Sequence, residues 1–230
     1  MSNDVLRYCG QFLSGLPLSD HGLDDVSIAI KQVDPALISL LYDLSIEVGI
    51  KPDEACIRVL PAIFQSACYQ LLSSQEGKVN EKSICLLTLQ NLHNLGLQKC
   101  GLSDHQKIQC YKLLTLVNAA QSDSISVVRW NLDKSIYSVK GISAYQYEAY
   151  FSIISANTKK HELLMSLGHA YGILSGIATD ILNKHARFES LNSTSQTELK
   201  NWALTQARTI ANVEILPLSV QLPSLIQYLR

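Results

Sequence analysis

The sequence has few charged residues and lacks the local signals of several protein classes. Only 17% of its 230 residues are charged, against about 25% in an average globular protein, whereas 47% are apolar. No Lys/Arg run exceeds two residues and the formal net charge is −1, so the cationic face that non-specific nucleic-acid binding needs is missing. No uninterrupted apolar run is long enough for a transmembrane helix.

The cysteines follow no metal-binding or disulfide pattern. None forms a CxxC pair, and most lie in apolar stretches; they are Cys9, Cys56, Cys68, Cys85, Cys100 and Cys110. We therefore expect buried, reduced thiols that pack as small hydrophobic side chains. Reduced cysteine indicates a reducing compartment, and the first four residues lack the basic and apolar regions of a signal peptide. The sequence thus predicts a cytoplasmic protein.

Common catalytic motifs are also missing. The sequence contains no GxSxG, HExxH, P-loop or GxGxxG pattern, and its six histidines are scattered. No nucleophile, metal centre or nucleotide site can be assigned from such motifs.

The apolar residues recur at steps of three and four, which is the period of a helix. The sequence predicts an all-α fold, a single-domain multi-helix bundle over residues 1–230, with eight to ten helices. Asp34-Pro35 is a helix start, an N-cap acid followed by proline at the first helical position. Lys51-Pro52-Asp53 starts another helix, in which Pro61 predicts a kink or a break.

The second half of the chain gives two further expectations, one for a loop and one for a buried helix face. Residues 124–142 contain the strand-like Ser126-Val127-Val128-Arg129-Trp130, which we interpret as a loop or helix end, and the next helix is expected to start at Ser143. The helix expected over about residues 160–185 carries an apolar stripe that we predict to be buried: Leu163, Leu167, Ile173, Leu174 and Ile177.

A motif in this helix resembles one of the trans-isoprenyl diphosphate synthases, which are class I prenyl-chain elongation enzymes. That family carries G-[apolar]3-Q-I-x-D-D-x-x-D. Here the frame runs from Gly172 to Asn183, and of its three acids only Asp180 remains, with Thr179 and Asn183 at the other two positions. Gly176 stands where glutamine is usual.

Three further positions extend the resemblance to about residues 35–190. Asn157 stands in place of the lysine of a helical Lys-Thr pair, and Ala120-Gln121 resembles a Gly-Gln pair. Where the family has its first D-D-x-x-D motif, residues 71–78 hold a single acid, Glu76. The resemblance implies an isoprenoid-synthase fold, with substrate-binding positions at Asp180, Thr179, Asn183, Glu76, Asn157 and Gln121.

Family members hold Mg²⁺ between two acid clusters, and the metal stabilises the departing diphosphate. Mg²⁺ prefers carboxylate oxygens and water. Only Asp180 and Glu76 remain as metal-ligand candidates, so no residue is assigned a catalytic role, and Mg²⁺ is expected as a cofactor only if the protein is active.

The resemblance therefore predicts a catalytically degenerate isoprenoid-synthase-like protein. It would bind a prenyl ligand, or form a homo- or hetero-oligomer such as a dimer with an isoprenoid-synthase-like subunit. The alternative is an active class I prenyltransferase or terpene synthase with an altered metal site, to which Asp43, Glu47 or Asp123 could add acids. A generic helical scaffold is a third interpretation.

Overall fold

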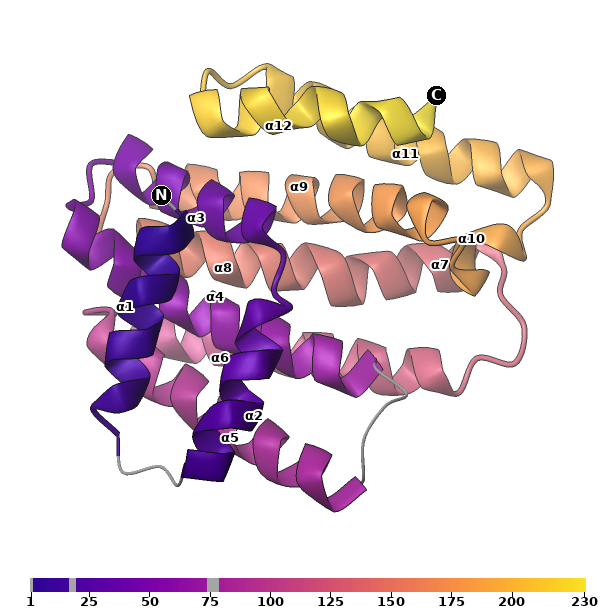
Figure 1. Ribbon diagram of the computed structural model, residues 1–230. Coiled ribbons are helices and arrows are strands. Elements are labelled where there is room, and N and C mark those ends of the chain that lie inside the picture. The colour runs from indigo at the N-terminus through magenta and orange to yellow at the C-terminus, as the bar shows by residue number, and fades with distance from the viewer. Residues whose placement is uncertain (1, 17–19, 74–78) are drawn as a thin grey trace. The chain divides into compact units, whose positions relative to one another are not determined.

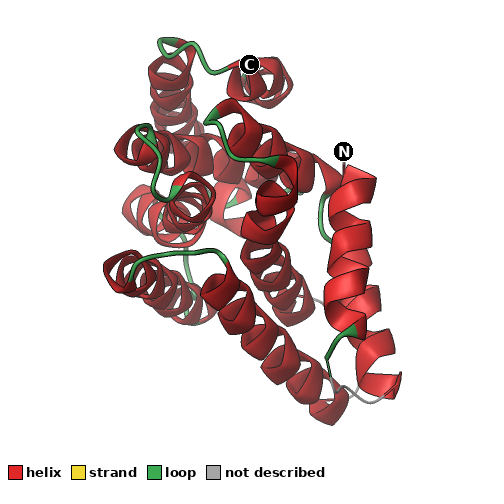
Figure 2. Cartoon of the chain, turned by 90° about the vertical axis from the view of Figure 1, so that its left-hand side faces the viewer, coloured by secondary structure: helices red, strands yellow, loops and turns green. Residues whose placement is uncertain are grey.

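The computed structural model describes residues 2–16, 20–73 and 79–230, and every regular element in these residues is helical (Figure 1). Figure 2 shows helices and loops only, which confirms the predicted all-α class. The chain forms two compact units, Met1–Ser103 and Asp104–Arg230. The assignment of residues 1–230 to a single domain stays a prediction. None of the described helices is long and apolar enough to cross a membrane.

The first unit is built around the packing of its two longest helices, α4 and α5. Its helices are α1 (Ser2–Ser14), α2 (Asp20–Lys31), α3 (Pro35–Glu47), α4 (Pro52–Ser73) and α5 (Val79–Lys99). The helix start predicted at Asp34-Pro35 is confirmed, because the Asp34 carboxylate accepts a hydrogen bond of 2.8 Å from the backbone N–H of Ala36.

Of the kink or break predicted at Pro61, the break is wrong, since α4 continues through the proline, and the kink stays a prediction. Proline has no N–H, so the carbonyl of Ile57 has no helical donor, but the thiol of Cys100 lies 3.6 Å from it. The carbonyl of Pro61 itself accepts a hydrogen bond from His93 Nδ1 at 2.8 Å. The pKa of His93 is lowered by burial, so this histidine is a neutral member of the core. His93 of α5 and Cys100, which follows α5, thus contact the backbone of α4 around the proline.

The second unit is layered, with α9 between α8 and α11, and with α6 on the other side of α8 (Figure 1). Its helices are α6 (Asp104–Ile125), α7 (Leu132–Val139), α8 (Tyr145–Ser155), α9 (His161–Leu182), α10 (Ala186–Glu189), α11 (Ser193–Ala211) and α12 (Leu216–Ile226), with a π-helical turn η1 (Lys140–Ala144) and a 3₁₀ turn η2 (Gln227–Leu229). The Tyr147 ring contacts those of Tyr150 and Phe151 in α8 and of Tyr171 in α9, so aromatic side chains pack between these two helices.

The helix expected to start at Ser143 begins earlier. The backbone is helical from Leu132, capped by Asn131, through the π turn and on to Ser155. This start was missed because the buried residues of α7 and η1 are mostly small or polar, which gives little apolar period; they are Ser135, Ser138, Val139, Gly141 and Ala144. The loop predicted between α6 and this helix is present, but it ends at Asn131.

Four members of the stripe predicted in α9 are buried: Leu167, Ile173, Leu174 and Ile177. The fifth prediction is wrong, because Leu163 is 40% exposed. Leu163 lies in the first turn of the helix, at the edge of the packed surface.

All six cysteines lie in the described residues and are buried free thiols, as predicted. Burial raises the pKa of Cys9 and of Cys68 to about 12, so both stay protonated at neutral pH. The cytoplasmic location stays a prediction.

Candidate functional site

The end of α9 carries the acid that the sequence singled out. Asp180 lies in the last turn but is only 2% exposed. After the cap residue Asn183, Lys184 takes a positive φ of 50° and the chain reverses, so that the N–H of His185 donates to the carbonyl of Asp180 at 2.8 Å. This reversal brings α10, and with it Arg187, back onto Asp180.

Arg187 and Asp180 form a buried bidentate ion pair. Nε of Arg187 donates to Oδ2 of Asp180 at 2.5 Å, and Nη2 donates to Oδ1 at 2.7 Å. Both side chains are almost fully enclosed. Bidentate guanidinium–carboxylate pairs combine charge with a fixed planar geometry, so the orientation of both groups is set.

Serines of α7 complete the surroundings of Arg187. Its Nη1 donates to Oγ of Ser138 at 2.9 Å, and its backbone carbonyl accepts from Oγ of Ser135 at 2.7 Å. Ser138 lies 2.8 Å from Oγ of Ser124 in α6, which in turn donates to the carbonyl of Ala120. These bonds have one consistent direction, from Arg187 through Ser138 and Ser124 to Ala120. Arg187 therefore links α6, α7, α9 and α10.

The other predicted positions of the α9 motif do not share this environment. Thr179 and Asn183 are exposed, and Asn183 is the C-cap of the helix, whereas Asp180 points into its own unit. The structure thus separates the three positions into one buried acid and two exposed neutral residues.

The remaining candidates are dispersed. Gln121 is half-buried near the end of α6. Asn157 is exposed, with a φ of 63°, in the turn that follows α8, and so is not on a helix as the expected frame requires. Glu76 lies outside the described residues, so its position relative to Asp180 stays a prediction. Among the acids considered for an altered site, Asp123 accepts a hydrogen bond of 3.0 Å from the hydroxyl of Tyr137.

The Mg²⁺ site implied by the sequence resemblance does not fit the described residues. A multi-metal site needs several carboxylates with free oxygens. Both oxygens of Asp180 are already bonded to Arg187, and Thr179 and Asn183 are neutral. In the part of the chain that is described, no three His, Cys, Asp or Glu side chains are grouped to hold a metal ion.

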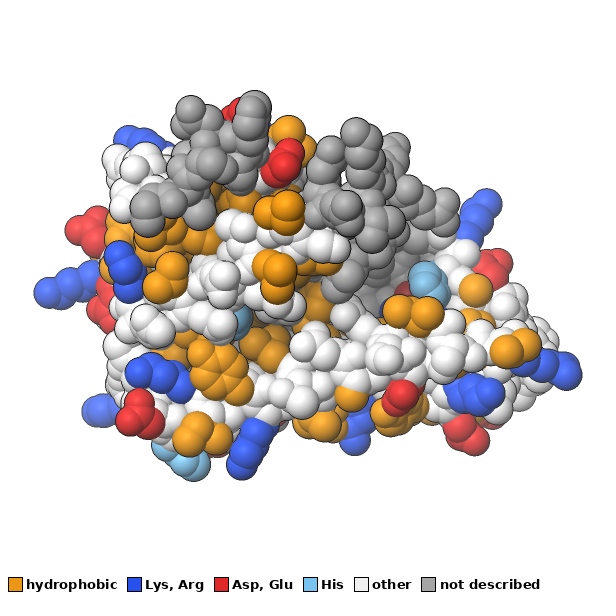
Figure 3. Space-filling model, turned by 90° about the horizontal axis from the view of Figure 1, so that it is seen from below, with side chains coloured by type: hydrophobic (Ala, Val, Ile, Leu, Met, Phe, Trp, Pro, Cys, Tyr) orange, Lys and Arg blue, Asp and Glu red, His pale blue; other side chains and the backbone are white. Residues whose placement is uncertain are grey.

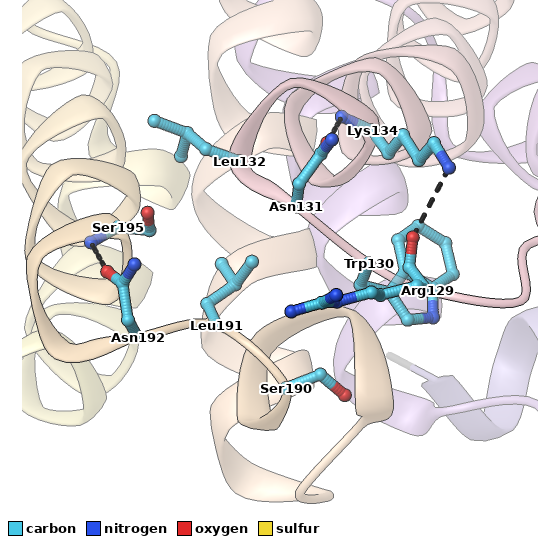
Figure 4. Close-up of a pocket in the computed structure, with 9 residues that line it drawn as sticks. All are labelled: Arg129, Trp130, Asn131, Leu132, Lys134, Ser190, Leu191, Asn192 and Ser195. Carbon is cyan, nitrogen blue, oxygen red and sulfur yellow. Dashed lines mark hydrogen bonds between the residues drawn. The ribbon is translucent and has the colours of Figure 1, made fainter.

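A cavity of about 470 Å³ opens beside this corner, at the starts of α7 and α11 (Figure 4). Its walls include the capping residues Asn131 and Asn192, which accept hydrogen bonds from the N–H groups of Lys134 and Ser195. In Figure 4 the Arg129 side chain extends toward Leu191, while Nζ of Lys134 bonds the carbonyl of Arg129 at 3.3 Å. None of the predicted site residues that the structure describes lines this cavity.

A second cavity lies against α8, α9 and α11 and contains a histidine–carboxylate pair that the sequence does not reveal. Nδ1 of His169 lies 2.8 Å from Oε2 of Glu148, and the Tyr145 ring contacts the imidazole edge-on. Lys140, the first residue of the π turn, also lines it. The two partners are far apart in sequence and on different helices, so only the folded chain reveals the pair.

Comparison with solved structures identifies the fold. The structure matches a geranyltranstransferase from Thermotoga maritima with a TM-score of 0.71 and 13% identity, over 99% of this chain and 96% of that chain. It matches a geranyltransferase from Legionella pneumophila with a TM-score of 0.68 and 12% identity, over 99% of this chain and 93% of that chain. It also matches a deletion mutant of the mint heterotetrameric geranyl pyrophosphate synthase, with a TM-score of 0.65 and 12% identity, over 97% of this chain and 96% of that chain.

These matches span nearly the whole of each chain, so the protein has the all-α isoprenoid-synthase fold. No protein-family model and no curated protein sequence matches this chain.

Proposed function

We propose that this chain is a catalytically degenerate member of the isoprenoid-synthase fold that acts by binding a partner subunit. One observation carries the proposal: Thr179 and Asn183, two of the three acid positions in the motif, are exposed neutral side chains. Neutral oxygens cannot offset the charge of several Mg²⁺ ions, and without these ions the charge on a departing diphosphate is not stabilised.

A prenyl-transfer assay tests the lack of catalysis. The purified chain is incubated with Mg²⁺, isopentenyl diphosphate and allylic diphosphates of several lengths, and products are separated by chromatography. We expect no turnover above the buffer control. The matched variant is Thr179→Asp with Asn183→Asp, which restores the acid count of the α9 motif.

Mg²⁺-dependent transfer by the unaltered chain would establish the alternative, an active prenyltransferase or terpene synthase with an altered metal site. In that case Asp180→Asn separates two versions of the site. Loss of transfer in a variant that stays folded, as circular dichroism shows, would place Asp180 in the metal site, whereas retention would place the metal at other acids.

Partner binding is supported by an uncharged, partly apolar face on α5. From residue 83 to residue 98 this helix has no Asp, Glu, Lys or Arg. Ile84 and Leu87 are 64% and 61% exposed, and Leu95 follows on the same side of the helix. Interface cores are depleted of charge and rich in apolar side chains, and exposed apolar patches mark interaction sites.

A second uncharged stretch lies on α6, over residues 113–122. Ile108, Tyr111 and Leu116 of this helix are exposed large hydrophobic residues. Exposed hydrophobic side chains are visible in the view of Figure 3. The mint synthase among the structural matches is heterotetrameric, so assembly of subunits occurs on this fold.

We expect the purified chain to self-associate, and Leu87→Glu to weaken that association at least tenfold. The variant places a charge in the centre of the uncharged α5 face, where it would be desolvated on binding. Sedimentation equilibrium measures the mass, with Val220→Glu on α12 as a control that adds the same charge at another exposed apolar position.

A chain that sediments as a 25.5 kDa monomer at all concentrations would contradict self-association. Partner binding would then require a different isoprenoid-synthase-like subunit. Binding of a prenyl ligand is a separate proposal, which protection of the chain against thermal unfolding by prenyl diphosphates or prenyl alcohols would support.

A further inference from the structure

The geometry points to Arg187 as an internal cation that replaces a divalent metal ion at Asp180. The folded chain neutralises this carboxylate with its own guanidinium, so that Asp180 is a structural residue of the α9–α10 corner and not a metal ligand. This inference concerns the chemistry of one residue and goes beyond the proposed lack of catalysis.

The first support is the use of both carboxylate oxygens. Each oxygen of Asp180 accepts from a different nitrogen of one guanidinium, at 2.5 and 2.7 Å. A metal ion at this carboxylate would have to displace Arg187 or share the oxygens with it. Sharing would place a divalent ion beside a buried positive charge that is paired with no second carboxylate among the described residues, which is costly in a low-dielectric environment.

The second support is that Arg187 is held independently of Asp180. Ser138 accepts from its Nη1, and Ser135 donates to its backbone carbonyl. The Ser138 hydroxyl is itself oriented, because Ser124 donates to the carbonyl of Ala120 and so accepts from Ser138. The guanidinium is therefore preorganised, and a dissolved cation competes against a group that is already in place.

The neighbouring titratable group is consistent with a charge-balanced pair. His185, two residues before Arg187, accepts from the N–H of Arg187 through Nδ1 at 3.2 Å. Burial lowers the pKa of His185, so it is neutral at pH 7 and adds no charge to the corner. One carboxylate and one guanidinium remain, with opposite unit charges.

Metal binding provides the direct test, with Mn²⁺ as the probe. Free Mn²⁺ is followed by electron paramagnetic resonance while unaltered protein or Asp180→Asn is added. We expect the two titrations to coincide, whether they are flat or report weak binding at surface acids. A bound ion present in the unaltered protein and lost in Asp180→Asn would overturn the inference.

A thermodynamic cycle tests the pair without a metal. Arg187→Met and Asp180→Leu each leave one buried charge without its partner, and we expect each to lower Tm by roughly 10 °C. The double variant removes both charges and should unfold within a few degrees of the unaltered protein, above either single variant. A double variant that is no more stable than the single variants would overturn the inference.

The two proposals fail separately. Prenyl transfer by the unaltered chain would contradict the proposed function even if Mn²⁺ avoids Asp180 and the cycle shows strong coupling. Mn²⁺ bound at Asp180 in a chain without turnover would instead overturn the role of Arg187 and leave the lack of catalysis standing.

Discussion

Replacing Leu167 with aspartate should lower the free energy of unfolding by roughly 4 kcal/mol or more. Leu167 is 2% exposed in the middle of α9, the helix that packs against both α8 and α11. The change removes a buried apolar side chain and introduces a carboxylate. The residues three and four positions away on the same helix carry no charge that could pair with it. Urea denaturation followed by circular dichroism measures the loss, and the slope of the transition reports whether unfolding stays cooperative.

Leu163→Asp is the matched control, since it makes the same substitution one turn earlier in the same helix. Leu163 is already 40% exposed, and an acid in the first turn of a helix interacts favourably with the helix dipole. We expect a loss below about 1 kcal/mol. Equal losses in the two variants would mean that the apolar side of α9 is not the side that the structure buries.

The helices of this protein could be predicted where apolar period and capping residues agree. Asp34-Pro35 combines a side-chain cap with a fixed φ, and both act within a few residues, so the start of α3 is visible in the sequence. The start of α7 was missed because two of its three buried positions are serines. Ser135 and Ser138 face inward to bond Arg187, and a hydrophobic period cannot report a polar contact.

The candidate site was predictable only in part. The motif frame located Asp180, but its partner is seven residues away, across the reversal at Lys184, and not at the i, i+3 or i, i+4 spacing of contacting side chains within one helix. The same frame treated Thr179 and Asp180 as members of one cluster, although adjacent residues on a helix point about 100° apart. Burial decides between them, and burial depends on which side of α9 meets α7 and α8.

A different signal in α9 was available and carries information about packing. Gly168, Gly172 and Gly176 recur at intervals of four residues and so lie along one side of the helix. The structure places this side against η1 and α8. A Cβ at Gly168 would lie 2.7 Å from the carbonyl oxygen of Tyr147, and one at Gly176 would lie 2.5 Å from Oγ of Ser143. Small residues at this spacing let two helices approach closely, as they do here.

Gly172→Ala should therefore destabilise the protein by about 2–4 kcal/mol, although alanine is the better helix former by roughly 1 kcal/mol. The new Cβ would collide with the backbone oxygen of Ser143 and lie 2.7 Å from Cα of Ala144. Both atoms belong to the backbone of η1, so relief requires the π turn to move away from α9, and no side chain can rotate to make room.

Gly10→Ala is the control, because Gly10 lies within α1 and a Cβ there would meet nothing within 4 Å. It should leave Tm unchanged or raise it slightly, whereas Gly172→Ala should lower Tm by roughly 4–16 °C for a chain of this size. Differential scanning calorimetry on both variants measures the contrast. If Gly172→Ala unfolds at or above the Tm of the unaltered protein, then η1 does not lie against α9 as closely as the structure has it, and the glycine spacing would have no role in the packing of this helix.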